Sequence, residues 1–154
     1  MTTSFRMSPD HARDISHIVR YLKRYKLPIW VIGTSRGTIS AVTVAKSVKG
    51  LSGLILTSSV TRENRKGPEI LQMGLDKIKV PTLVVSHRKD GCHVTPASDT
   101  PEVIKMLRAS SNTKAKFFTG GSEISHPCKG KSYHGFFKIE QKVVQSIAHF
   151  ISNN

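Results

Sequence analysis

One serine stands between two glycines at the point where an apolar segment gives way to a helical one. The motif Gly33-Thr34-Ser35-Arg36-Gly37 has the spacing G-x-S-x-G and lies between the apolar run 29–32 and a predicted helix at 36–48. In such a strand–turn–helix unit the turn is strained, so the positions two residues before and two residues after the serine need small residues. The turn makes the serine oxygen project from the edge of the sheet. This serine could act as a nucleophile, with the backbone N–H of Arg36 at the helix N-terminus donating to an oxyanion. A glycine-rich turn that binds phosphate is the alternative interpretation.

A serine nucleophile needs a base, and the base needs a carboxylate that orients it. Asp90 follows the predicted strand 81–85, and His134 stands after a long loop, immediately before the last predicted helix. Because the C-terminal ends of parallel strands meet at one edge of a sheet, we expect Asp90 and His134 to lie beside Ser35. The chain order Ser, Asp, His is one that such catalytic sites use.

The segments that must position these residues alternate between strand-like and helix-like along almost the whole chain. The predicted strands are 29–32, 54–56, 81–85 and 115–118, and the predicted helices are 8–25, 36–48, 69–74, 100–107 and 137–150. Strands that are apolar on both faces are typical of a parallel sheet covered by helices. We therefore predict an α/β fold, a doubly wound, mostly parallel sheet of about four strands. At this length, residues 1–154 form a single predicted domain.

From Pro28 onward the sequence resembles the second half of an α/β-hydrolase domain. The resemblance rests on the elbow at 33–37, on the strand and acid loop at 81–90, and on Tyr133-His134-Gly135-Phe136. It implies a serine hydrolase that acts on small carboxylic esters through an acyl-enzyme. The polar stretch 59–79 is too short for a cap domain, which implies an open site.

The same resemblance assigns a role to each candidate residue. Ser35 would be the nucleophile, His134 the general base and Asp90 the orienting acid, in an elbow framed by Gly33 and Gly37. The family's further strands before the nucleophile are missing, and with them the second oxyanion donor. A hydrolase-like binding module that is inactive or crippled is therefore the main alternative.

Loss of those strands also leaves the nucleophile strand 29–32 at an edge of the sheet. An uncovered apolar edge invites pairing with another strand. We therefore expect a homodimer, a partner chain on this edge, or a fragment of a longer protein.

The resemblance implies that Cys92 and Cys128 occupy neighbouring loops at the active edge. A disulfide between them would join the acid loop to the histidine loop, and two buried free thiols are the alternative. Candidate metal ligands gather in the same loops: His87, Cys92, His93, His126, Cys128 and His134. Their spacing does not follow a recognised zinc pattern, so we predict no metal and no other cofactor.

The charge is the one unusual bulk property, because 24 Lys and Arg against 10 Asp and Glu give a net charge of +14. Such a surface attracts anions, and it suggests an anionic substrate. The basic residues are spread along the chain without a stacking pattern, so a nucleic-acid-binding domain is the weaker alternative. No apolar run approaches the roughly 18–20 residues of a membrane span.

The segment Met1 to Pro9 lacks the apolar core of a signal peptide, which favours a cytoplasmic protein. A disulfide in a longer parent protein would instead indicate the periplasm or secretion.

Overall fold

Four parallel strands form one sheet in the order β1-β2-β3-β4, so each strand pairs with its neighbour in the sequence. The computed structural model describes residues 2–63, 67 and 69–154. The strands are β1 (Trp30–Thr34), β2 (Gly53–Thr57), β3 (Thr82–His87) and β4 (Thr113–Phe118). The helices are α1 (Thr3–Met7), α2 (Pro9–Leu22), α3 (Gly37–Ser47), α4 (Thr100–Met106) and α5 (Glu140–Ser152). Short 3-10 turns are Lys23–Tyr25, Ile70–Met73, Leu75–Lys77, Ala97–Asp99 and Tyr133–Gly135.

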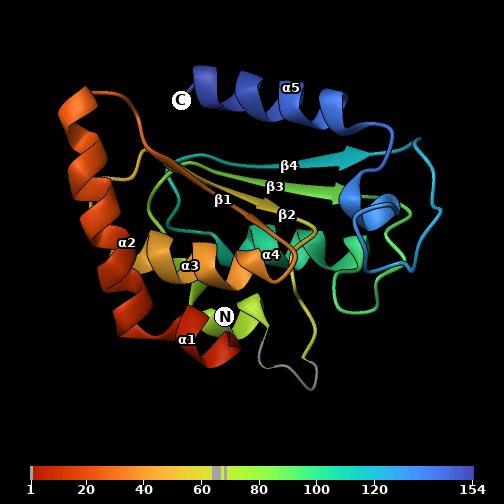
Figure 1. The fold of residues 1–154 in the computed structure, drawn as a ribbon, viewed down its shortest axis with the longest axis horizontal. Coiled ribbons are helices and arrows are strands. Elements are labelled where there is room, and N and C mark those ends of the chain that lie inside the picture. Colours follow the sequence, from red (N-terminus) through yellow and green to blue (C-terminus); the bar gives the residue numbers. More distant parts are fainter. Residues whose placement is uncertain (1, 64–66, 68) are drawn as a thin grey trace.

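Helices cover both faces of the sheet, as the predicted α/β fold requires. In Figure 1, α3 and α4 lie on one face and α5 lies alone on the other. Alternate residues of β2 point into the two cores, with Leu54 and Leu56 packing toward α3 and Ile55 toward α5. Every residue of β2 and β3 is buried, which explains why their sequences are apolar on both faces.

The N-terminal helices pack on the outer side of α3. Ala12 and Val19 of α2 contact Val44 of α3 in a third, smaller core. Ser8 caps α2 as its sequence predicts, since its hydroxyl accepts a hydrogen bond from the N–H of His11 at 3.1 Å. The preceding helix α1 was not predicted, because its five residues are too few to show a helical period.

The last helix begins three residues later than predicted, at Glu140 rather than at residue 137. Phe136 and Lys138 adopt left-handed backbone conformations, with φ of 57° and 69°. Residues in this conformation cannot continue a right-handed helix. The turn they form carries the chain from His134 to the start of α5.

Strand β1 lies at the edge of the sheet, because it pairs only with β2. Ile32 of β1 is 54% exposed, and Val144 of α5 is 63% exposed. The sequence predicted that the strand 29–32 is covered by helices on both faces, but the side chain of Ile32 is left partly open to solvent. Among the described residues, no helix has the length and apolar character needed to cross a membrane.

Candidate active site

The backbone at Ser35 has the strained turn that the G-x-S-x-G motif predicts. Ser35 follows β1 directly and has a φ of 51°, a left-handed conformation that side-chain-bearing residues rarely adopt. Its N–H donates to the carbonyl of Thr57 at the end of β2, at 3.0 Å, and its carbonyl accepts from the N–H of Thr38 at 2.9 Å. These two hydrogen bonds hold the turn between the sheet and α3.

The two glycines of the motif are not equivalent. A Cβ at Gly33 would lie 2.6 Å from the carbonyl oxygen of Gly37 and 2.7 Å from Cβ of Ala41, so only glycine fits there. A Cβ at Gly37 would meet no described atom within 4 Å. The close approach expected at both glycines is therefore found at Gly33 only.

Arg36 stands at the N-cap of α3, and its side chain turns away from the motif. Its guanidinium donates to the hydroxyl of Thr3 at 2.8 Å. Within the described part of the chain, the backbone N–H of Arg36 makes no hydrogen bond. This N–H points out of a helix N-terminus, where it can bind a developing negative charge.

Asp90 lies in the loop after β3, and both oxygens of its carboxylate have hydrogen-bond partners. Oδ1 accepts the N–H of Cys92 at 2.9 Å, and Oδ2 accepts the hydroxyl of Thr95 at 3.0 Å. Oδ2 also lies 3.0 Å from Nδ1 of His134. The Asp90 side chain is 1% exposed and that of His134 is 6% exposed, so water does not compete for this contact.

The backbone of His134 is fixed from two sides in the 3-10 turn Tyr133–Gly135. Its N–H donates to the hydroxyl of Ser132 at 3.2 Å, and its carbonyl accepts the hydroxyl of Ser58 at 2.8 Å. Because the carboxylate oxygen accepts, the hydrogen bond to Asp90 requires a proton on Nδ1 of His134, and Nε2 lies outside this contact. Among the described residues, Nε2 has no hydrogen-bond partner.

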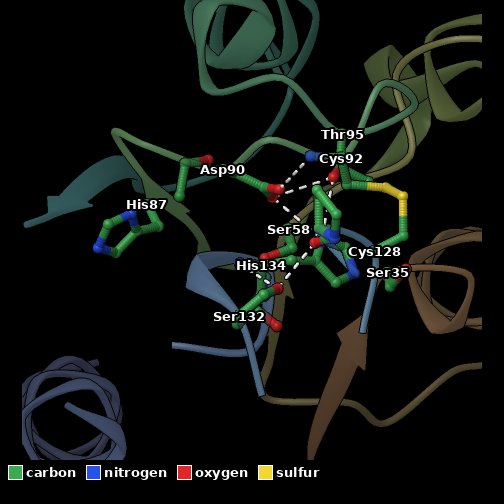
Figure 2. Close-up of polar contacts among 12 residues, drawn as sticks. Ser35, Ser58, His87, Asp90, Cys92, Thr95, Cys128, Ser132 and His134 are labelled. Atoms are coloured by element: carbon green, nitrogen blue, oxygen red, sulfur yellow. Dashed lines mark hydrogen bonds and ion pairs between the residues drawn. A yellow bond between two sulfur atoms is a disulfide. The ribbon is translucent and has the colours of Figure 1, made fainter. Parts of the chain in front are cut away.

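Ser35 lies across the imidazole ring of His134 from Asp90, as Figure 2 shows. Both residues are anchored to the end of β2, Ser35 through Thr57 and His134 through the adjacent Ser58. The hydroxyl of Ser35 makes no hydrogen bond with any described residue. The fold thus brings together the three side chains that the sequence singled out.

Three hydroxyl groups of the site had no sequence signal. Thr95 touches both Asp90 and His134, while Ser58 and Ser132 hold the histidine backbone. Ser58 is 1% exposed and Ser132 is 0% exposed. Serines and threonines are common in loops, so only their contacts in the folded chain distinguish these three.

Cys92 and Cys128 form a disulfide with their Cα atoms 4.6 Å apart, linking the acid loop to the histidine loop. The two sulfur atoms and a ring nitrogen of His93 all lie within 4.8 Å of one another, and the sulfur atoms are bonded to each other in this form. His87 lies elsewhere, fully buried, with Nε2 2.9 Å from the carbonyl of Gly120 and its ring stacked on Tyr133.

A small cavity of about 220 Å³ lies between the end of β1 and α5. Thr34 and Gly135, the chain neighbours of Ser35 and His134, belong to its lining. The remaining lining residues are mostly apolar: Ile32, Thr57, Phe136, Glu140, Val143, Val144 and Ile147. A larger hollow of about 740 Å³ lies near α2 and the end of α3 and contains no residue of the candidate site.

No protein-family model matches the sequence, and no curated protein matches it either. Solved structures do resemble it. An esterase from Pyrococcus furiosus superposes with a TM-score of 0.69 at 14% identity, over 96% of this chain and 63% of that protein. A monoacylglycerol lipase from Paleococcus ferrophilus superposes with a TM-score of 0.53 at 12% identity, over 71% of this chain and 64% of that protein. A serine hydrolase homologue from Coxiella burnetii superposes with a TM-score of 0.56 at 16% identity, over 92% of this chain and 57% of that protein.

The chain spans about half to two thirds of the length of these proteins. At such low identity the likeness concerns the fold, and it extends over most of this chain. Together with the four parallel strands and the turn at Ser35, it shows that this protein has an α/β-hydrolase-like fold.

Proposed function

We propose that this protein is a serine hydrolase that cleaves small carboxylic esters through an acyl-enzyme. The observation that carries the proposal is the buried contact between Asp90 and His134, with the strained Ser35 turn across the imidazole ring. Three groups with complementary roles in acyl transfer converge from three separate loops.

The proposed reaction begins when Oγ of Ser35 attacks the ester carbonyl and Nε2 of His134 accepts its proton. Asp90 keeps the proton on Nδ1 and stabilises the imidazolium that forms. The N–H of Arg36 donates to the oxyanion of the tetrahedral intermediate. His134 then protonates the departing alcohol, and a water molecule, activated by the same histidine, releases the acid from Ser35.

The mostly apolar cavity of about 220 Å³, lined by Thr34 and Gly135 beside Ser35 and His134, could receive the acyl group of the substrate. The esterases and the lipase among the similar structures support the same reaction class. The net charge of +14 favours an anionic ester. Equal turnover of neutral and carboxylate-bearing esters at low salt would contradict that preference.

A second candidate function is binding without hydrolysis. It is favoured by the number of oxyanion donors, because the backbone N–H of Arg36 is the one such donor that we identify beside Ser35 among the described residues. Loss of one donor typically lowers the rate by about 10²–10³-fold.

Hydrolysis of a short-chain nitrophenyl ester separates the two candidates. We expect turnover by the wild type that is lost in Ser35→Ala and in His134→Ala, with all three proteins giving the same thermal unfolding profile. Labelling with a fluorophosphonate, followed by peptide mass spectrometry, should place the adduct on Ser35. A folded wild type that is neither labelled nor faster than its variants would leave only the binding function.

A further inference from the structure

We infer that Cys92, His93 and Cys128 form a zinc site when the disulfide is reduced. The donor atoms of these three residues all lie within 4.8 Å of one another. Nδ1 of His93 lies 4.0 Å from Sγ of Cys128. The sequence offered six candidate ligands in these loops without a recognised zinc spacing, and the fold brings these three together.

The two sulfur atoms are bonded to each other in the disulfide, so reduction must first let them move apart before zinc can bind. With Zn–S bonds of about 2.3 Å and Zn–N bonds of about 2.0–2.1 Å, the donors of a tetrahedral site lie about 3.5–3.8 Å apart. After reduction the two sulfur atoms therefore have to separate to that spacing, and the ring nitrogen of His93 has to move toward them by up to about 1.3 Å. Two thiolates and one imidazole are ligands that Zn²⁺ prefers, and a fourth position remains for water.

The exposure of the three residues sets the order of events. Cys92 is 2% exposed, Cys128 is half-buried and His93 is exposed. A thiol reductant therefore reaches Sγ of Cys128 first. The thiolate of the reductant attacks Sγ of Cys128 and forms a mixed disulfide with it. The S–S bond between the two cysteines breaks, and Cys92 leaves as a thiolate.

A second thiol of the reductant then displaces Cys128, and the reductant departs as its own disulfide. Two electrons have passed from the reductant to the two cysteines. When Zn²⁺ binds, the two cysteine thiols lose their protons to water, and the oxidation state of the metal does not change. The site is thus open to metal only in its reduced form.

The proposed zinc site is separate from the proposed hydrolase chemistry. Neither Ser35 nor His134 belongs to the cluster, and the oxygens of Asp90 are already occupied by Cys92 N–H, Thr95 and His134. Figure 2 shows the disulfide beside the contact between Asp90 and His134. Zinc binding can therefore be measured without any assay of hydrolysis.

The test compares oxidised and reduced full-length protein with Zn²⁺ and with Co²⁺. We expect one metal ion per reduced chain, measured by competition with a chromogenic chelator, and a thiolate-to-cobalt absorption band. The oxidised chain should bind none. A reduced, folded chain that binds no metal would overturn the inference.

His126 supplies a control from the loop of Cys128: it lies outside the cluster, and its Nδ1 accepts the backbone N–H of Cys128 at 3.2 Å, a bond that the side-chain oxygen of glutamine can also accept. His93→Gln should weaken zinc binding by at least about tenfold. Loss of a residue that only supports a metal ligand already lowers metal affinity by about 10–100-fold, and His93 is a direct ligand in the proposed site. His126→Gln should leave binding unchanged, and Ser35→Ala should bind as the wild type does. Equal affinity of His93→Gln and the wild type, or a loss confined to His126→Gln, would contradict the site. If hydrolysis fails while these results hold, only the proposed function is wrong.

Discussion

The hydroxyl of Thr95 lies 3.0 Å from Nδ1 of His134, the same ring nitrogen that faces Asp90. It also donates to Oδ2 of Asp90 at 3.0 Å. Thr95 is 3% exposed, so no water can replace it. One hydroxyl thus fixes both the carboxylate and the imidazole of the candidate site.

We predict that Thr95→Val lowers kcat for ester hydrolysis by about tenfold to a hundredfold, with a smaller effect on KM. A hydrogen bond to a charged group contributes about 1.5–3 kcal/mol, and each 1.4 kcal/mol is a factor of ten in rate. Thr95→Ser keeps the hydroxyl and should retain most of the activity. Equal kcat values for the valine and serine variants would show that only the bulk of Thr95 matters.

The glycines of the serine turn allow a matched test of stability. Gly33→Ala should lower the free energy of unfolding by about 1–3 kcal/mol, because its Cβ would collide with the backbone of Gly37 and with Ala41. Gly37→Ala lies in the first turn of α3 with open space around it and should be neutral or slightly stabilising. Urea denaturation of both variants measures the difference, and equal losses would contradict the steric explanation.

Asp99 should contribute stability that depends on pH. Burial acts to raise the pKa of this carboxyl, but hydrogen bonds from Arg62, Thr61 and Ser98 and the charge of Arg62 together lower it. Because the pKa of Asp99 is lower in the folded state, its ionised form adds to the free energy of unfolding at pH values above the unfolded-state pKa of about 3.9. This stabilisation is lost as the pH falls through the folded-state pKa.

We therefore expect Asp99→Asn to be less stable than the wild type at pH 7 by under about 1 kcal/mol, because the partner Arg62 is 56% exposed and solvent screens the pair. The gap should close below about pH 4. Chemical denaturation at pH 7 and pH 3 checks this, and a gap of the same size at both values would contradict it.

The apolar edge at β1 should cause self-association. Replacing Ile32, which is 54% exposed, by lysine places a charge on the unpaired strand and should shift the protein toward monomer. Size-exclusion chromatography with light scattering measures the change. The helix-surface substitution Ile18→Lys, at a residue 53% exposed on α2, serves as the control and should have little effect. An equal shift in both variants would indicate general charge repulsion rather than strand pairing.

The sequence allowed the sheet to be predicted, and it singled out Ser35, Asp90 and His134 as candidates, because each of these steps depends on local patterns. Buried strands such as β2 and β3 are continuous apolar runs, and Ser35 and Asp90 follow strand ends. Parallel strands then determine that these residues share one edge.

Features that depend on contacts between distant segments could not be predicted. The role of Thr95 depends on a histidine 39 residues away, and the late start of α5 depends on the left-handed backbone at Phe136 and Lys138. The cluster around His93 likewise requires two loops to meet, and no spacing within either loop reveals it.

The simple strand order has a consequence for how the protein is made. Each new strand can add to the one before it, so the sheet can grow as the chain leaves the ribosome, from β1 toward β4. The serine turn is complete as soon as β2 pairs, whereas His134 is synthesised only after β4. A nascent chain that ends before the histidine loop would therefore carry Ser35 without His134, and the proposed catalytic site would be complete only once that loop has been made.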